Sequence, residues 1–157
     1  MRVHTGSKIC TILTISSCLI QPAFAGDDSR ISCNNKTLKG TYMYSVSGVL
    51  SAGENNYMPA AWSGLISYDG RGSMTLKRTT SVDGSWVTAV TKGAYSIQAD
   101  CTGIGTYPTA RWTYYVAPDG SSVNFLKTGN IDGDGFIESP DRISGTAKRV
   151  SKQQARD

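Results

Sequence analysis

The segment Trp62-Ser63-Gly64-Leu65-Ile66-Ser67-Tyr68-Asp69-Gly70-Arg71-Gly72-Ser73-Met74-Thr75-Leu76 decides the fold of this 157-residue chain. Apolar side chains recur at alternate positions in both halves, Trp62, Ile66 and Tyr68 in the first and Met74 and Leu76 in the second. Period-two alternation over short runs is typical of half-buried strands. Asp-Gly between two such runs indicates a tight turn, because glycine tolerates positive φ. The segment therefore predicts an antiparallel β-hairpin.

The same alternation recurs along the rest of the chain between turn sequences such as Asp83-Gly84. We expect strands over residues 40–50, 59–68, 73–81, 86–91, 93–99, 103–107, 110–117, 121–128 and 143–150. Short connections make sequential strands pair antiparallel, so the predicted fold is all-β, a single antiparallel meander. About eight or nine strands avoid exposed edges by closing into a small β-barrel, and a β-sandwich is the alternative. Gly64, Gly93 and residues 103–105 are the expected bends.

The N-terminal residues 1–25 have the composition of a signal peptide. Arg2 and Lys8 make a positive region, an apolar stretch follows, and Ala23-Phe24-Ala25 supplies small residues for signal peptidase. We predict cleavage after Ala25, which leaves residues 26–157 as one β-barrel domain. The apolar stretch is shorter than the ~20 residues of a spanning helix, so no transmembrane segment is expected after cleavage.

The predicted location is therefore exported, either periplasmic or secreted. One alternative is a membrane anchor that is retained. The other is lipidation at Cys18, because Ile15-Ser16-Ser17-Cys18 resembles a bacterial lipobox. We favour the cleaved form, because Leu19-Ile20 is not the usual polar tether after a lipidated cysteine.

Loss of residues 1–25 would leave a nearly neutral chain without histidine. Arg2 and Lys8 are two of the 16 basic residues, so 14 would face 12 acidic ones, a charge of +2 that argues against nucleic-acid binding. His4 is the single histidine, so its loss excludes Ser-His-Asp and Cys-His nucleophiles and His-ligated metal sites. Cys33 and Cys101 would remain, and we expect them to form one disulfide in an oxidising compartment, the alternative being free thiols.

Residues 130–141 have the spacing of a twelve-residue calcium loop, with oxygen side chains at positions 1, 3, 5, 9 and 12 and glycine at 6. The predicted ligands are Asn130, Asp132, Asp134, the Phe136 carbonyl, Glu138 and Asp141. The flanking segments are expected strands and not helices, so a bound Ca²⁺ would be structural and would pin the last strand. The alternative is an ordinary acidic hairpin connection in which Asp-Gly serves the turn.

Aromatic residues are spread over most of the expected strands: Tyr42, Tyr44, Trp62, Tyr68, Trp86, Tyr95, Trp112, Tyr114 and Tyr115. In a small barrel they either fill the core, which we favour, or line an apolar pocket. Arg78, Arg111 and Lys127 also fall within strands. We expect them to face water with their stems on the barrel wall, whereas pointing inward they would receive an anionic or carbonyl ligand. Residues 53–59 form a surface loop or a cap on the barrel mouth.

Several blocks carry a resemblance to a known family: residues 38–42, 64–72, 93–103 and 144–149, above all Asp100-Cys101-Thr102-Gly103. Over most of residues 26–157 the chain resembles an uncharacterised family of small exported bacterial β-barrel proteins, broadly similar to calycin and allene-oxide-cyclase-type barrels. The resemblance implies a small antiparallel barrel. It implies no established activity and therefore assigns no catalytic residues. The longer acidic segment before the last strand departs from the family.

The sequence thus predicts a non-catalytic exported module that binds a small apolar ligand or a partner protein, with one structural calcium. A barrel-type cyclase or isomerase, using a tyrosine or carboxylate in an apolar cavity, is the alternative. Glu54 and Glu138 are the only glutamates, and neither falls in an expected strand interior, so few carboxylates are available as a base. A cavity with a Tyr–Arg or Asp–Tyr pair would favour the enzyme. A surface interaction protein is the third class, and an exposed aromatic patch would indicate it.

Overall fold

The computed structural model describes residues 32–133 and 135–151, and almost all of them form β-strands. The predicted signal peptide, its cleavage site and Cys18 lie outside the described residues. The elements are η1, a short 3-10 helix (Asn35–Thr37), and strands β1 (Lys39–Ser51), β2 (Tyr57–Asp69), β3 (Ser73–Val82), β4 (Ser85–Ile97), β5 (Thr102–Tyr107), β6 (Ala110–Val116), β7 (Ser122–Asp132), β8 (Gly135–Glu138) and β9 (Arg142–Ser151). Within these ranges, no helix has the length and apolar character needed to cross a membrane.

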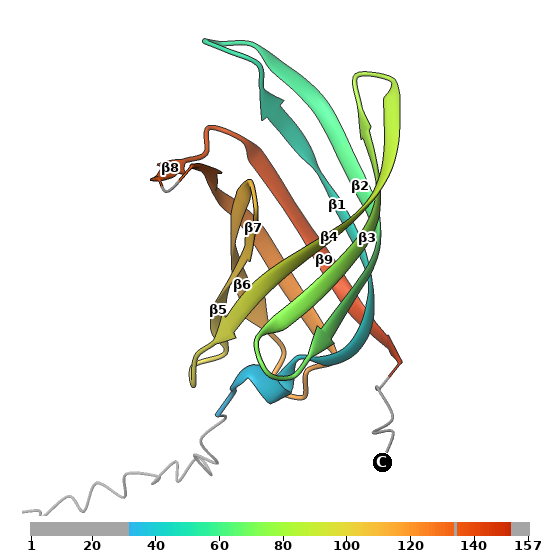
Figure 1. Ribbon diagram of the computed structural model, residues 1–157, viewed down its shortest axis with the longest axis vertical. Helices are drawn as coiled ribbons and strands as arrows, with labels where there is room; N and C mark the ends of the chain where they lie inside the picture. Colours follow the sequence, from blue (N-terminus) through green and yellow to red (C-terminus); the bar gives the residue numbers. More distant parts are fainter. Residues whose placement is uncertain (1–31, 134, 152–157) are drawn as a thin grey trace, which may run out of the picture.

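The strands form an antiparallel meander that closes on itself (Figure 1). From β1 to β7 each strand pairs with the next one in the chain, and β9 pairs with both β7 and β1. Eight strands thus make a closed barrel, and β8 is an additional strand on β7. The predicted barrel is confirmed, and the alternative of a sandwich is not what the chain forms.

Two strands differ from the prediction. The expected strands 86–91 and 93–99 are one continuous strand, β4, that runs through Gly93. A Cβ atom at Gly93 would lie 2.5 Å from the carbonyl oxygen of Thr106, so glycine lets β4 approach β5 closely without a break. The second difference is β8. The expected loop after residue 128 instead continues as strand β7 to Asp132 and returns as β8.

Aromatic side chains fill one half of the barrel interior. Tyr68 lies at the centre of this tyrosine cluster, with its ring centroid 5.3 Å from that of Tyr42, 5.0 Å from Tyr95 and 6.4 Å from Tyr114, each in an edge-to-face arrangement. Such pairs contribute about 0.5–1.5 kcal/mol each beyond the area they bury. All four rings are buried, which makes this half a packed core.

The end of the barrel next to the tyrosine cluster is sealed by η1, and we call it the closed end; the opposite end is the mouth. Figure 1 shows η1 beneath the barrel and the β1–β2 and β3–β4 hairpins projecting at the mouth. The guanidinium of Arg149 donates from Nε to the Tyr42 hydroxyl (3.0 Å) and from Nη2 to the Thr37 carbonyl (2.9 Å). The Tyr95 hydroxyl donates to the Leu38 carbonyl at 2.8 Å. Tyrosine hydroxyls and an arginine therefore satisfy the carbonyls that the closure buries.

Cys33 and Cys101 form the predicted disulfide at this closed end, with their Cα atoms 4.9 Å apart. Both cysteines are buried, and they are 68 residues apart in sequence. The bond thus ties the segment before η1 to the connection between β4 and β5.

Replacing both Cys33 and Cys101 with alanine is expected to lower the free energy of unfolding by about 4 kcal/mol, because the crosslink restricts a long loop in the unfolded chain. Urea unfolding followed by tryptophan fluorescence measures the difference. Wild-type protein in a reducing agent is the matched control and is expected to lose a similar amount. Equal stability of the oxidised and reduced wild type would contradict the prediction.

Candidate functional site

The mouth half of the barrel contains a cavity of about 250 Å³. Its apolar lining is made of Val46, Trp62, Ile66, Leu76, Trp112 and Phe125. Small-molecule sites usually have volumes of ~300–1,000 Å³ and are mainly apolar with a few polar groups. The cavity is slightly below that range, so its size and lining suit a small ligand.

The row that carries Tyr44 and Arg78, two residues of the cavity wall, also contains two small residues. Tyr44, Gly64, Arg78 and Ala89 are in register across β1, β2, β3 and β4, so they lie on the same face of the sheet. A Cβ at Gly64 would lie 2.0 Å from the carbonyl oxygen of Lys77, so this position admits no side chain. Arg78 is therefore flanked by two small residues, in contrast to the aromatic packing of the closed end.

Two polar groups of this row are buried without a hydrogen-bond partner among the described residues. They are the Nε atom of Arg78 and the hydroxyl of Tyr44, and both residues line the cavity. Burial raises the pKa of Tyr44 to about 12, and the nearby positive charge of Arg78 offsets only part of this rise. Tyr44 is therefore a neutral hydrogen-bond donor at physiological pH.

A second basic residue, Lys127, lies on another part of the cavity wall and is paired. It forms a salt bridge with Asp141, and the two side chains are only 10% and 6% exposed. The Asp141 carboxylate also accepts hydrogen bonds from the Ser51 N–H (2.8 Å) and the Ser139 hydroxyl (2.8 Å). Burial would raise the pKa of Asp141, but the hydrogen bonds from Lys127, Ser51 and Ser139 outweigh it and hold that pKa below its usual value.

The expectation that the basic strand residues face water is wrong for Arg78 and Lys127, which line the cavity. Arg111 has a different environment. Its guanidinium lies 4.9 Å from the centroid of the Phe136 ring, which is 49% exposed. Since β6 side chains alternate between the two faces, neighbouring Trp112 takes the inward position.

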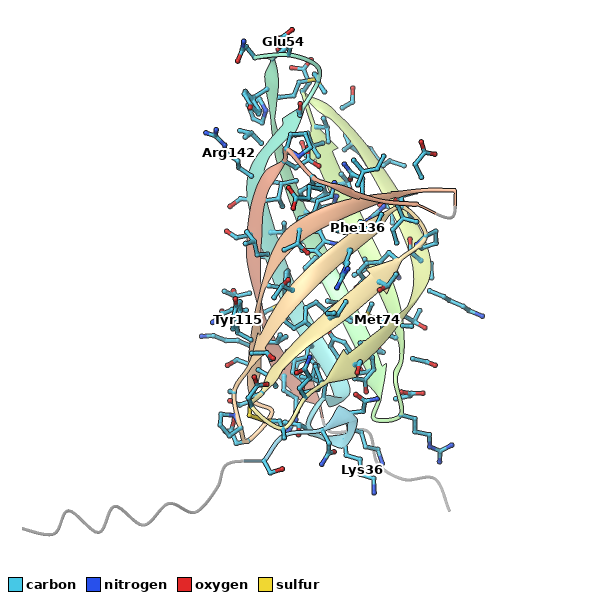
Figure 2. The ribbon with its side chains drawn as sticks, turned by 90° about the vertical axis from the view of Figure 1, so that its left-hand side faces the viewer. Lys36, Glu54, Met74, Tyr115, Phe136 and Arg142 are labelled. Carbon is cyan, nitrogen blue, oxygen red and sulfur yellow. A yellow bond between two sulfur atoms is a disulfide. The ribbon has the colours of Figure 1, made fainter. Side chains whose placement is uncertain are left out.

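Four of the predicted calcium ligands, Asn130, Asp132, Phe136 and Glu138, lie on the β7–β8 hairpin (Figure 2, near Phe136). Asp132 is paired with Gly135 and Glu138 with Gly129, which puts the two carboxylates on opposite faces of the β7–β8 ribbon. Asn130 lines the barrel cavity, Asp141 is paired with Lys127, and Asp134 lies outside the described residues. Among residues 32–133 and 135–151, no three Asp, Glu, His or Cys side chains are grouped as metal ligands.

The aromatic residues divide between the two expected roles. Tyr42, Tyr68 and Tyr95 belong to the core, whereas Tyr44, Trp62 and Trp112 line the cavity and Tyr114 contacts both regions. Two point outward, since Trp86 is 76% and Tyr115 is 56% exposed. Residues 53–59 are not among those that line the cavity: β2 begins at Tyr57, and Figure 2 places Glu54 at the tip of the β1–β2 hairpin.

Sequence reasoning missed Thr91 and Tyr107, which also line the cavity. Tyr107 shares the parity of Gly103 and Gly105 on β5, so alternation along that strand was the signal that assigns it to the interior. Thr91 lies opposite Leu76 on β3, and only the register of the hairpin reveals it.

Comparison with models of known protein families, with curated proteins and with solved structures gives no match to the chain. The resemblance to small exported bacterial barrels therefore stays a prediction, and the site is interpreted from its own geometry.

Asp141 gives a prediction for pH dependence. Its pKa is lowered in the folded state, so the stability it contributes is present above its unfolded pKa of ~3.9 and is lost as the pH falls through the folded value. Asp141→Asn should therefore lower the melting temperature at pH 7, and the difference from wild type should shrink below about pH 4. Thermal unfolding monitored by circular dichroism from neutral to acid pH measures it, with the exposed Asp132→Asn as control. A difference that is independent of pH would contradict this assignment.

Calcium binding by the β7–β8 hairpin stays a prediction, and it would require the hairpin to rearrange. It predicts heat in a calorimetric titration at millimolar calcium and a thermal shift that chelation reverses. Asp132→Asn should abolish both signals, whereas Asp83→Asn, in the distant β3–β4 turn, should leave them unchanged. No heat with the wild-type protein would remove the hypothesis.

Proposed function

We propose that the protein is an exported, non-catalytic β-barrel module that binds a small, mainly apolar ligand in the mouth half of the barrel. The observation that carries the proposal is the cavity of about 250 Å³ with two tryptophans and a phenylalanine in its wall. The tyrosine cluster blocks the closed end, so the ligand enters through the mouth. The disulfide supports export, because such bonds persist mainly in oxidising compartments.

Binding of a partner protein is supported less well. Trp86 and Val87 are strongly exposed near the tip of the β3–β4 hairpin, at 76% and 59%. Single exposed apolar residues are normal on protein surfaces, and an interaction site usually needs a contiguous apolar patch of several hundred Å². The cavity is the feature with the more specific shape and chemistry.

A barrel-type cyclase or isomerase is the second candidate, and the cavity provides an observation in its favour. It contains a tyrosine and an arginine, Tyr44 and Arg78, the combination expected for such an enzyme. We rank it second because a general base works best with a pKa near the operating pH, whereas the pKa of Tyr44 is about 12. The lining residues also include no Asp or Glu.

Binding of decanol, a neutral apolar probe, tests the proposal. Calorimetry should detect it with wild-type protein, and Thr91→Phe should weaken it about tenfold, because a phenyl ring that displaces two ligand methylenes removes ~1.6 kcal/mol. Thr75→Phe makes the same change on the outward face of β3 and should leave the affinity unchanged. Native mass spectrometry of protein from its own host should reveal a retained ligand.

The proposal fails if decanol does not bind, or if Thr91→Phe and Thr75→Phe behave alike. A ligand recovered from the host in chemically altered form, together with its precursor, would favour the enzyme instead.

A further inference from the structure

We propose that the ligand of this cavity carries a single carboxylate, which Arg78 and the hydroxyl of Tyr44 bind together, and that its apolar body lies against the aromatic wall. This inference rests on the proposed function and specifies the chemical class of the ligand.

The site has unused hydrogen-bonding capacity. Buried polar groups are nearly always hydrogen-bonded, and each exception requires an explanation. Arg78 Nε and the Tyr44 hydroxyl are two such exceptions on the same row of the cavity wall. Both can donate a hydrogen bond, so the missing partner is an acceptor.

The cavity wall also carries a positive charge. Among the described residues, the Lys127–Asp141 pair is the one salt bridge, and it makes that part of the wall neutral. No Asp or Glu is among the residues that line the cavity, so the guanidinium of Arg78 is its uncompensated charge. A half-buried charge without a counterion is costly, and an anionic ligand removes the cost. The acceptor is therefore an anion.

The positions of Tyr44 and Arg78 suit a small planar group. Tyr44 and Arg78 flank Gly64 on the two neighbouring strands, so their backbones are about 10 Å apart, or two strand spacings. Because Gly64 has no side chain, β2 places no side chain between Tyr44 and Arg78 at this register. A planar carboxylate can accept two hydrogen bonds from a guanidinium and another from a hydroxyl. One arginine and one neutral tyrosine suit a carboxylate better than a dianionic phosphate, which normally takes more donors.

The apolar part of the site indicates the chemistry of the rest of the ligand. Trp62 and Leu76 are each two residues along their strand from this row, so they face the same side of the sheet. On the opposite wall, the rings of Trp112 and Phe125 pack edge-to-face with their centroids 5.7 Å apart. They form a wall suited to an alkyl chain or an aromatic ring. The small volume favours a monocarboxylate of medium length.

A matched pair of probes, decanoate and decanol, tests the inference by calorimetry at neutral pH. Wild-type protein should bind decanoate about tenfold or more tightly than decanol. Arg78→Met should weaken decanoate about tenfold to a hundredfold, the range of one charged hydrogen-bonded contact, and leave decanol unchanged. Arg78→Lys should recover part of the loss, and Tyr44→Phe should weaken decanoate severalfold. Lys77→Met, the same change on the outward face of β3, is the control and should have no effect.

The two proposals fail in distinguishable ways. Equal binding of decanoate and decanol by the wild type, or an Arg78→Met variant that keeps full decanoate affinity, overturns the carboxylate assignment and leaves the apolar site in place. Binding of neither probe overturns both. The comparison of decanoate with decanol uses the wild-type protein alone, so it does not depend on the folding of a variant. For Arg78→Met, an unchanged near-UV circular dichroism spectrum and a raised melting temperature are expected, because the substitution removes an unpaired buried charge.

Discussion

The whole structure depends on β9 pairing with two strands at once. Its residues from Arg142 to Ser151 pair with β1, and part of the same strand pairs with β7, so each of the eight barrel strands has a paired neighbour on both sides over at least part of its length. Closure hydrogen-bonds the backbone groups that an edge would expose. Closure also sets the size of the barrel interior, which the inward-facing side chains then fill. The chain fills one half of that space with tyrosines and leaves a cavity in the other half, so the packed core and the proposed binding site lie at different ends of one barrel.

Much of the fold follows from the sequence because period-two alternation and Asp-Gly turns are local signals. Strand β2 shows this, since Leu65 and Ile66 lie on opposite faces of the sheet and, of these two, only Ile66 is buried. The break expected at Gly93 was wrong for a reason that lies outside the segment. Its missing side chain accommodates Thr106 of the next strand, and this contact is visible only once the strands are paired. The local sequence therefore identified Gly93 as a special position but did not show that β4 continues through it.

The site was less predictable, because it depends on register. The general preference of arginine for water favours an outward Arg78, but its parity with Leu76 points it inward, and it lines the cavity. The acidic segment shows the opposite problem. Its one-dimensional spacing matches a calcium loop, whereas strand pairing turns Asp132 and Glu138 to opposite faces. Spacing along a chain specifies ligands only where the backbone curves around a common point.

The described chain begins and ends at the same side of the barrel. The segment before η1 is fastened by the Cys33–Cys101 bond beneath the tyrosine cluster, and β9 finishes beside Thr41 at the start of β1 (Figure 1). Any tether joined at either terminus would thus hold the molecule by its sealed base. If the protein were immobilised on a bead or fused to a carrier, the mouth of the barrel would face the solution. This orientation suits a receptor or a sensor.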